Sequence, residues 1–215
     1  MIITIDGPAA AGKGTLASKL AEKYNLAYFD TGMVYRAVGL EMLLAKNSLE
    51  DIEKAEKLAQ SLTFPRMIEL SKNPDFRSLE GSKAASSVAA MPGVRSALLL
   101  MQQNFSKNPV FADGSKADGA IYDGRDTGTV ICPHADIKFF VTASPEVRAM
   151  RRFKEYESKG QKADYQEVLE QTIERDTRDY AREGSQPAQD AIHFDTSDMS
   201  IEEVFEKACK IIENR

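Results

Sequence analysis

Near the start of the chain, a lysine lies within a run of small residues, Gly7–Thr15, which reads Gly-Pro-Ala-Ala-Ala-Gly-Lys-Gly-Thr. The apolar stretch Met1–Ile5 before this run predicts a buried strand, and Leu16–Tyr24 after it predicts an amphipathic helix. A glycine-containing turn between a strand and a helix allows backbone N–H groups to surround phosphate oxygens, and Lys13 adds positive charge. The pattern therefore indicates a phosphate-binding P-loop, made of Gly7, Pro8, Ala9, Ala10, Ala11, Gly12, Lys13, Gly14 and Thr15.

This loop departs from the strict P-loop pattern at one position. The strict pattern has Ser or Thr directly after the lysine, whereas here Gly14 stands between Lys13 and Thr15. The Gly-Lys-Gly-Thr form weakens the expectation that the Thr15 hydroxyl binds magnesium directly. The alternative is a glycine-rich strand-to-helix turn with an incidental lysine, and the flanking strand and helix favour the P-loop over it. We expect the loop to bind a nucleoside triphosphate or a similar phosphate.

A second polar segment, Asp30-Thr31-Gly32-Met33-Val34-Tyr35-Arg36, follows the next apolar strand. Asp30 or Thr31 would cap a helix and place Tyr35 and Arg36 in its first turns. Ligands of open α/β sheets bind at the carboxyl ends of strands. An arginine beside a helix N-terminus at such a strand end is suited to a second phosphate. The alternative for this segment alone is a capped helix with a solvated arginine.

A third segment, Tyr122-Asp123-Gly124-Arg125-Asp126-Thr127-Gly128-Thr129, also follows an apolar strand directly. At a strand end beside a P-loop, the Asp123 carboxylate would orient magnesium through water. The planar guanidinium of Arg125 matches the geometry of a phosphate. Taken alone, Asp-Gly-Arg-Asp is also compatible with a simple tight turn.

The fourth segment is Arg175-Asp176-Thr177-Arg178-Asp179-Tyr180-Ala181-Arg182, within an expected helix. Arg175, Asp179 and Arg182 recur at spacings of four and three residues and so share one face. A salt-bridged surface ladder is the alternative for this segment. On the preceding expected helix, Arg148, Arg151 and Arg152 add another positive face.

Apolar strands alternate with helical patterns along the chain, which favours an α/β fold with a largely parallel sheet. The expected strands are Met1–Ile5, Ala27–Phe29, Ala120–Tyr122, Ile137–Val141 and Ala191–Phe194. The expected helices are Lys13–Tyr24, Met33–Leu44, Pro145–Ser158, Tyr165–Ala181 and Ile201–Glu213.

The middle of the chain, between the second and third strands, has the character of an insertion. Residues 50–61 predict a helix, Phe64–Leu79 alternates weakly like a short antiparallel patch, and two helices follow at Gly81–Ala90 and Pro92–Ser106. Lys107–Gly119 is polar and rich in Gly and Asp, which predicts a loop.

Composition places the chain among ordinary globular proteins, with 215 residues, 42% hydrophobic and 28% charged residues. A net charge of −5 argues against a general nucleic-acid binder. The two cysteines are far apart, which predicts reduced thiols rather than a disulfide framework. No signal peptide or long apolar run is evident, so we expect a cytoplasmic protein with no membrane partner. We also expect a monomer without a nucleic-acid partner.

Together, these segments resemble the bacterial cytidylate kinases of the nucleoside-monophosphate kinase family. The resemblance runs from residue 2 to about residue 212. It is carried by Ile3–Pro8, Asp30–Gly32 with Tyr35-Arg36, Ala84–Ala89 with Pro92 and Val94-Arg95, Asp123–Val130, Glu174–Asp176 with Arg178-Asp179, Asp195–Ser197 and Ser200–Glu202. Several collinear motifs of this kind are far more specific than a P-loop alone.

The resemblance implies a three-layer α/β P-loop kinase fold with a central parallel sheet, forming a single domain over 1–215. It implies an inserted monophosphate-binding lobe at about 31–107 and a short helical lid at about 148–165. The implied activity is phosphorylation of CMP and dCMP to CDP and dCDP by ATP with Mg²⁺, as part of pyrimidine nucleotide metabolism.

Carried over by position, the resemblance also implies roles for individual residues. Ser86, Arg95 and Asp126 would recognise the base, since a carboxylate accepts from the cytosine amino group where uracil has a carbonyl. Thr31, Arg175 and Asp179 would contact the sugar, and Arg36, Arg125 and Arg182 would hold the acceptor phosphate. Tyr35 would line the CMP site, and Arg151 would close over the transferring phosphoryl group. Metal binding would involve Thr15 and Asp123, the latter through water.

Some features depart from the family pattern and leave alternatives open. Thr31 stands where many relatives have serine, Lys107–Gly119 is longer than expected, and Phe64–Leu79 looks short and divergent. The nearest alternative is another P-loop small-molecule kinase, such as a UMP/CMP kinase or one for a different monophosphate. A regulatory P-loop switch or a scaffold would leave the acceptor-side arginines without a role.

Overall fold

A computed structural model of the chain describes residues 1–158, 160–181 and 184–215. The chain forms two compact units. The first unit comprises Met1–Phe29 and Asn108–Arg215, and the second comprises Asp30–Lys107. Each unit has its own buried core and is described by itself below.

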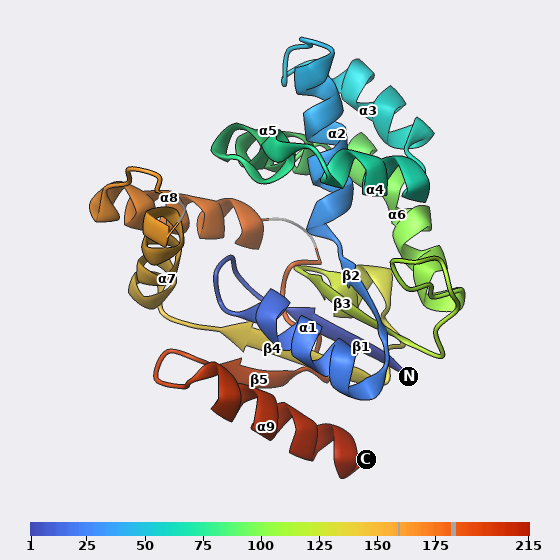
Figure 1. Cartoon of the computed structure of the whole chain (residues 1–215), viewed down its shortest axis with the longest axis vertical. Helices are drawn as coiled ribbons and strands as arrows, with labels where there is room; N and C mark the ends of the chain where they lie inside the picture. The colour runs from blue at the N-terminus through green and yellow to red at the C-terminus, as the bar shows by residue number, and fades with distance from the viewer. Residues whose placement is uncertain (159, 182–183) are drawn as a thin grey trace. The chain divides into compact units, whose positions relative to one another are not determined.

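A parallel sheet of five strands organises the first unit within the described residues (Figure 1). The strands are β1 (Ile2–Asp6), β2 (Ala27–Asp30), β3 (Ala120–Gly124), β4 (Ile137–Thr142) and β5 (Ile192–Asp195). Their order across the sheet is β2-β3-β1-β4-β5, which puts β1 in the middle. The expected α/β fold with a parallel sheet is confirmed.

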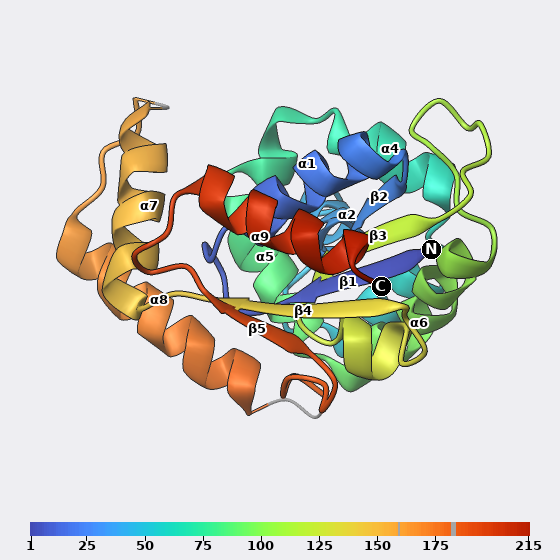
Figure 2. The same ribbon diagram turned by 90° about the horizontal axis from the view of Figure 1, so that it is seen from below.

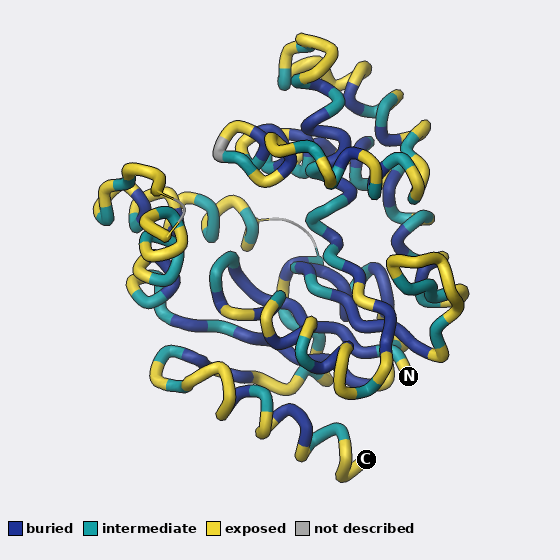
Figure 3. Tube along the Cα trace, in the orientation of Figure 1, coloured by how far each residue is buried: buried dark blue, intermediate teal, exposed yellow. Residues whose placement is uncertain are grey.

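The central strand β1 is buried because helices cover the sheet. Ile3 and Ile5 are fully buried on one face of the strand and Thr4 on the other, as a strand covered on both faces requires. Helices α1 (Lys13–Tyr24) and α9 (Ile201–Glu213) lie on the same face of the sheet (Figure 2). Leu16 and Leu20, four residues apart on α1, pack into this core, which Figure 3 shows as a continuous buried region along the strands.

The remaining helices of the first unit are α7 (Pro145–Ser158) and α8 (Tyr165–Tyr180), which pack against each other. Asp164 caps α8 by accepting hydrogen bonds from Gln166 N at 2.9 Å and Glu167 N at 3.1 Å. Phe153 and Tyr165 meet edge to face with ring centroids 6.2 Å apart. The sequence places α1, α7 and α9 with their observed bounds, and α8 one residue too long.

From Gly32 to Lys107, the regular elements of the second unit are helices. The unit contains α2 (Gly32–Leu44), α3 (Ile52–Ser61), α4 (Phe64–Ser71), a short 3-10 helix (Pro74–Arg77), α5 (Leu79–Ala89) and α6 (Pro92–Lys107). Helix α2 packs against α5, and α3 packs against α6. The helices expected at 50–61, Gly81–Ala90 and Pro92–Ser106 are confirmed with small shifts at their ends.

The antiparallel patch expected at Phe64–Leu79 is wrong, because this segment forms α4 and the 3-10 helix. Thr63 caps α4 by accepting from Arg66 N, and a proline follows in the first turn. Met67 and Leu70 are buried at helical spacing. In a helix of only two turns, this spacing of apolar residues is hard to distinguish from the apolar–polar alternation of a strand. The capping residue is therefore the stronger sequence signal for a helix.

The segment expected to be a loop at Lys107–Gly119 contains one antiparallel bridge, between Val110 and Lys116. Both cysteines are buried free thiols. No single helix in the described part of the chain is long and apolar enough to cross a membrane. The pair Glu80–Ala89 and Pro92–Lys107 would reach the required length and composition only together, and it is bent by 94°.

Candidate active site

The P-loop lies between β1 and α1, as the sequence predicts. Gly12 occupies the N-cap position of α1 with φ of +93°, a left-handed value that favours glycine. No side chain caps this helix, and its first turn contains no acidic residue. The N-terminal N–H groups therefore face an environment without a competing carboxylate on the same turn, which favours an anion.

Lys13 is a buried cation in this loop. Its Nζ donates to the carbonyl oxygen of Pro8 at 3.0 Å and lies 3.6 Å from Asp123 Oδ1. Burial and, after it, the positive charge of Arg125 together lower the pKa of Lys13 to about 8. A bound phosphate would reverse this effect, because it places negative charge beside the ammonium group.

The structure gives a reason for glycine at position 14. A Cβ atom at Gly14 would lie 3.2 Å from Asp123 Oδ2 and 3.5 Å from the Tyr28 hydroxyl. The Tyr28 hydroxyl also lies 3.5 Å from that carboxylate oxygen. Gly14 thus leaves space for the Asp123 carboxylate to lie against the start of α1.

The oxygen atoms of Thr15 and Asp123 are of the type that Mg²⁺ prefers. No cluster of three or more His, Cys, Asp or Glu side chains suited to a metal occurs among the described residues. Thr15 is exposed, and Asp123 is partly buried beside Lys13. This donor set fits a magnesium ion that keeps several waters and arrives with a nucleotide, rather than one held in a protein cage.

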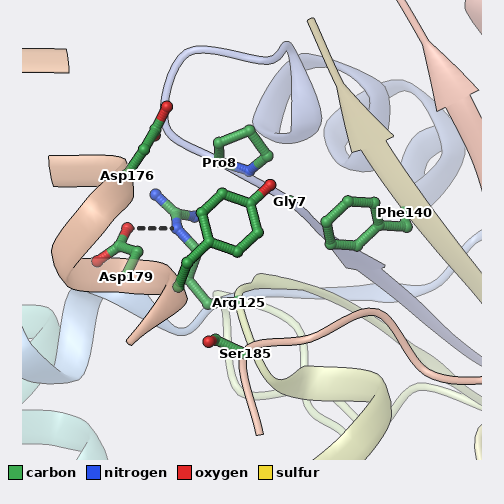
Figure 4. A pocket seen from close by; sticks show the side chains of 8 residues that line it. Gly7, Pro8, Arg125, Phe140, Asp176, Asp179 and Ser185 are labelled. Atoms are coloured by element: carbon green, nitrogen blue, oxygen red, sulfur yellow. Dashed lines mark hydrogen bonds and ion pairs between the residues drawn. The ribbon is translucent and has the colours of Figure 1, made fainter. Parts of the chain in front are cut away.

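A pocket opens beside the P-loop within the first unit (Figure 4). Arg125 and Asp179 face each other in it, with Arg125 Nε donating to Asp179 Oδ2 at 3.0 Å. Arg175 Nε lies 3.8 Å from the same oxygen. The pocket is lined by Gly7, Pro8, Arg125, Phe140, Asp176, Asp179, Tyr180 and Ser185.

This arrangement joins three of the segments singled out in the sequence. The P-loop contributes Gly7 and Pro8, the end of β3 contributes Arg125, and α8 contributes Asp179. Asp126 is buried next to them, at the start of the π-helical turn η2 (Thr127–Ile131). Arg182 lies outside the described residues.

The residues of the second unit that the sequence analysis expects on the acceptor side include Arg36 on α2, Ser86 on α5 and Arg95 on α6. Arg36 Nη1 donates to the carbonyl oxygen of Phe76 at 3.1 Å and to Ser82 Oγ at 3.0 Å. The Arg95 guanidinium lies over the ring of Tyr35, 5.6 Å from its centroid. Ser86 is half-buried on α5.

Helix α2 begins at Gly32, one residue before the expected Met33. Thr31 occupies the N-cap position, but its side chain makes no capping hydrogen bond. Asp30 Oδ1 instead accepts from Gly32 N at 2.9 Å.

With this geometry established, comparison with known proteins decides the family. A family model described as cytidylate kinase matches residues 3–214, almost the whole chain. The chain belongs to the cytidylate kinase family. This confirms the family expected from the sequence.

Relatives within the cytidylate kinase family match over nearly their full length. The cytidylate kinase of Paramagnetospirillum magneticum is 48% identical over 213 residues, covering 98% of this chain and 97% of the relative. That of Methylocella silvestris is 46% identical over 216 residues, covering 100% and 94%. The solved shikimate kinase from Bacteroides thetaiotaomicron shares the fold, with a TM-score of 0.53 at 14% identity, covering 99% of this chain and 98% of that one.

This cytidylate kinase family member also contains P-loop contacts that sequence reasoning missed. The sequence suggests only that Arg148 belongs to a positive face of its helix, and the structure shows that it is buried. Its Nη1 donates to Asp176 Oδ1 at 3.0 Å and to the Ala9 carbonyl oxygen at 3.3 Å. Its Nε donates to the carbonyl oxygen of Ala143 at 2.9 Å. No spacing rule within one helix predicts these contacts.

Arg151, expected to lie in the lid, contacts a residue that the sequence did not assign a role. Its Nη1 donates to Thr196 Oγ1 at 3.1 Å, and its Nη2 donates to the Thr196 carbonyl oxygen at 2.7 Å. Thr196 Oγ1 in turn lies 3.2 Å from the Ala11 carbonyl oxygen of the P-loop. Arg151 is therefore linked to the P-loop through Thr196.

Proposed function

We propose that the chain transfers the γ-phosphoryl group of ATP to CMP and dCMP, giving CDP and dCDP. The observation that carries the proposal is the pocket in which the P-loop residues Gly7 and Pro8 meet Arg125 and Asp179. A triphosphate-binding loop and a phosphate-binding arginine in one pocket support transfer between two phosphates. Both the acceptor and the product are pyrimidine nucleotides, so the reaction belongs to pyrimidine nucleotide metabolism.

On the donor side, we assign the triphosphate to the P-loop. The backbone N–H groups of Gly7–Thr15 would surround its phosphates, and Lys13 would neutralise their charge. Thr15 and Asp123 would hold Mg²⁺, with Asp123 acting through water, and the ion would screen the β and γ phosphates.

On the acceptor side, the proposal assigns the phosphate to Arg36, Arg125 and Arg182. It assigns the sugar to Thr31, Arg175 and Asp179, and the base to Ser86, Arg95 and Asp126. The carboxylate of Asp126 would accept from the cytosine amino group and repel the carbonyl of uracil. The stacking of Arg95 on Tyr35 supports this assignment, because it fixes the plane of the guanidinium.

Catalysis would come from positioning and from charge screening. The acceptor phosphate is already an anion, so its oxygen needs no general base. Arg125 and Lys13 would hold the two polyanions in line, and the Arg151 guanidinium would approach the transferring group when the proposed lid, residues 148–165, closes. Exclusion of water by this lid would limit hydrolysis of ATP.

The proposal takes its simplest form as a cytoplasmic monomer with two lobes. The inserted monophosphate-binding lobe would comprise residues 31–107, close to the bounds of the second unit. Light scattering of the purified chain with and without both nucleotides tests the monomer.

A panel of nucleoside monophosphates tests the function directly. Purified protein is mixed with ATP, Mg²⁺ and one of CMP, dCMP, UMP, AMP or GMP, and formation of ADP is followed. We expect turnover with CMP and dCMP, and much weaker turnover with the purine nucleotides AMP and GMP. Turnover with AMP or GMP that matches that with CMP would contradict the proposal, and Lys13→Ala provides the inactive control.

A further inference from the structure

Asp6 is a buried carboxylate for which the proposed mechanism has no use. It is the last residue of β1, directly before the P-loop, and only 6% of it is exposed. Its Oδ1 accepts from Thr127 N at 2.9 Å and from Thr127 Oγ1 at 2.8 Å. Its Oδ2 accepts from Gly128 N at 2.8 Å. Both oxygens are thus engaged by one short segment, far away in the sequence.

The two backbone donors are the first N–H groups of the turn η2. Such groups at the start of a helical turn need an acceptor, which the side chain of the N-cap residue usually supplies. The N-cap residue here is Asp126, and aspartate is one of the best capping residues. Its side chain nevertheless makes no capping hydrogen bond. Asp6 caps the turn from a different strand.

Strand register explains how Asp6 reaches this position. Asp6 pairs with Gly124 across the parallel strands β1 and β3, two residues before Asp126. A Cβ atom at Gly128 would lie 2.9 Å from Thr4 Oγ1 and 3.3 Å from Asp6 Oδ2. Glycine at position 128 therefore permits the close approach of the turn to β1.

The pKa of Asp6 reflects its burial and also the proximity of the Asp126 carboxylate. Burial raises the pKa of Asp6, the hydrogen bonds from Gly128 and Thr127 oppose this effect, and the negative charge of Asp126 adds to it. If both carboxylates capped the same turn, they would be closer still and would repel each other. Capping by Asp6 keeps the Asp126 carboxylate away from the N–H groups of Thr127 and Gly128.

We propose that Asp6 is a positioning residue for substrate specificity, which caps η2 in place of Asp126 and so keeps the Asp126 carboxylate out of the cap, in the position from which the proposed function has it contact the acceptor base. The inference rests on the proposed function, in which Asp126 reads cytosine. It adds a residue that touches neither nucleotide and acts through Asp126 alone.

The principal test is Asp6→Asn, which preserves the shape of the side chain. The oxygen of the new amide can still accept from Thr127. Its NH₂ group then faces the N–H of Gly128, and two donors cannot form a hydrogen bond with each other. In the variant, the Asp126 carboxylate is expected to cap the Gly128 N–H that has lost its acceptor, and so to move away from the base. The ratio of kcat/KM for CMP to that for UMP should fall about tenfold, the effect of one charged hydrogen bond. The KM for ATP should stay close to the wild-type value.

Further variants separate positioning from a general loss of structure. Asp136→Asn removes the same charge from a carboxylate at the other end of β1, where Asp136 Oδ2 accepts from Ile2 N at 2.6 Å. It should leave the ratio between CMP and UMP unchanged. If Asp6→Asn does not fold, Thr127→Val removes only the hydroxyl donor to Asp6 and should lower the ratio in the same direction, whereas Thr127→Ser should restore it.

A double-mutant cycle decides whether Asp6 acts through Asp126. In an Asp126→Asn background, Asp6→Asn should not lower the ratio further, because the group that it positions is already gone. A fall of the same size in both backgrounds, or a lower melting temperature with an unchanged ratio, would overturn the proposal. Failure of the proposed function itself would be distinct, because wild-type protein would then show no preference for CMP.

Discussion

Arg148 and Asp176 form a two-pronged ion pair between α7 and α8. Arg148 Nη1 donates to Asp176 Oδ1 at 3.0 Å, and Nη2 contacts the other carboxylate oxygen. The same Nη1 also donates to Ala9 of the P-loop. The pair therefore connects the donor loop to the helix that carries Arg175 and Asp179.

Loss of this pair should destabilise the first unit. Arg148→Met leaves the Asp176 carboxylate, whose side chain is 14% exposed, without its cation. Breaking a buried pair in this way lowers the free energy of unfolding by about 3 kcal/mol. Urea denaturation measures the change, and Arg178→Met on the exposed side of α8 is the control. Equal stability of the two variants would show that the pair contributes nothing net.

Lys13→Ala should abolish most of the activity without unfolding the protein. The variant removes a charge that acts on the transferring phosphoryl group, so kcat should fall by about 100- to 1,000-fold. Lys19→Ala is the control, because Lys19 lies on the same helix but pairs with Glu202 at the surface. Near wild-type turnover of Lys13→Ala would contradict the assignment of the P-loop.

The lowered pKa of Lys13 predicts that nucleotide binding takes up protons at alkaline pH. Without nucleotide the pKa is about 8, below the ordinary 10.5, so the side chain loses its charge above pH 8. Bound phosphates raise the pKa again, because their negative charge stabilises the ammonium group. Binding near pH 9 should therefore take up about one proton, whereas binding near pH 7 should take up almost none.

Titration calorimetry in two buffers of different ionisation enthalpy measures this uptake with a non-hydrolysable ATP analogue. Affinity should fall as the pH rises above 8. Lys13→Arg is the control, since a guanidinium stays protonated throughout this range. The same proton uptake in Lys13→Arg would assign the effect to another group.

Asp126→Ala should weaken CMP far more than ATP. A charged hydrogen bond to the base contributes about 1.5–3 kcal/mol, so the KM for CMP should rise by about 10- to 100-fold. Initial rates with each nucleotide varied in turn give both constants. Asp113→Ala in the exposed loop is the control. Equal losses for CMP and ATP would argue against a role for Asp126 at the base.

The parts of this site that are local in sequence could be predicted, and those made by tertiary packing could not. The P-loop is contiguous, so its glycines, lysine and flanking elements reveal it directly. The pairing of Arg148 with Asp176 depends on how α7 packs against α8, which neither helix encodes alone. The capping of η2 by Asp6 depends on strand register. Thr196 lies beyond β5 and reaches the P-loop only through the fold.

The fold itself was predictable where hydrophobic periodicity is long and clear. Helices of twelve or more residues, such as α1 and α9, show several repeats of the apolar pattern. Helix α4 has eight residues, too few for the period to separate a helix from a strand. Its capping residue Thr63 and the following proline are the signals that would have identified it.

Gly14→Ala should separate stability from activity. Alanine favours a helix over glycine by about 0.5–1 kcal/mol, so the melting temperature should stay equal or rise. The new methyl group would lie 3.2 Å from Asp123 Oδ2, which forces the carboxylate to move. Because that carboxylate is proposed to orient Mg²⁺ through water, the Mg²⁺ concentration for half-maximal activity should increase. Binding of Mn²⁺ in the presence of ADP, followed by electron paramagnetic resonance, should weaken in parallel.

The control for this substitution is Ser18→Ala, an exposed position on the same helix. It gains helix propensity without approaching Asp123, so its metal dependence should match the wild type. Gly14→Ala with unchanged Mn²⁺ binding would show that Asp123 can move at no cost. Glycine would then be required at position 14 for a reason other than space for the carboxylate. Weaker metal binding with retained stability would instead show that Gly14 leaves space for Asp123 to orient the ion. In this form of the loop, Asp123 would then do what a hydroxyl directly after the lysine does in the strict P-loop pattern.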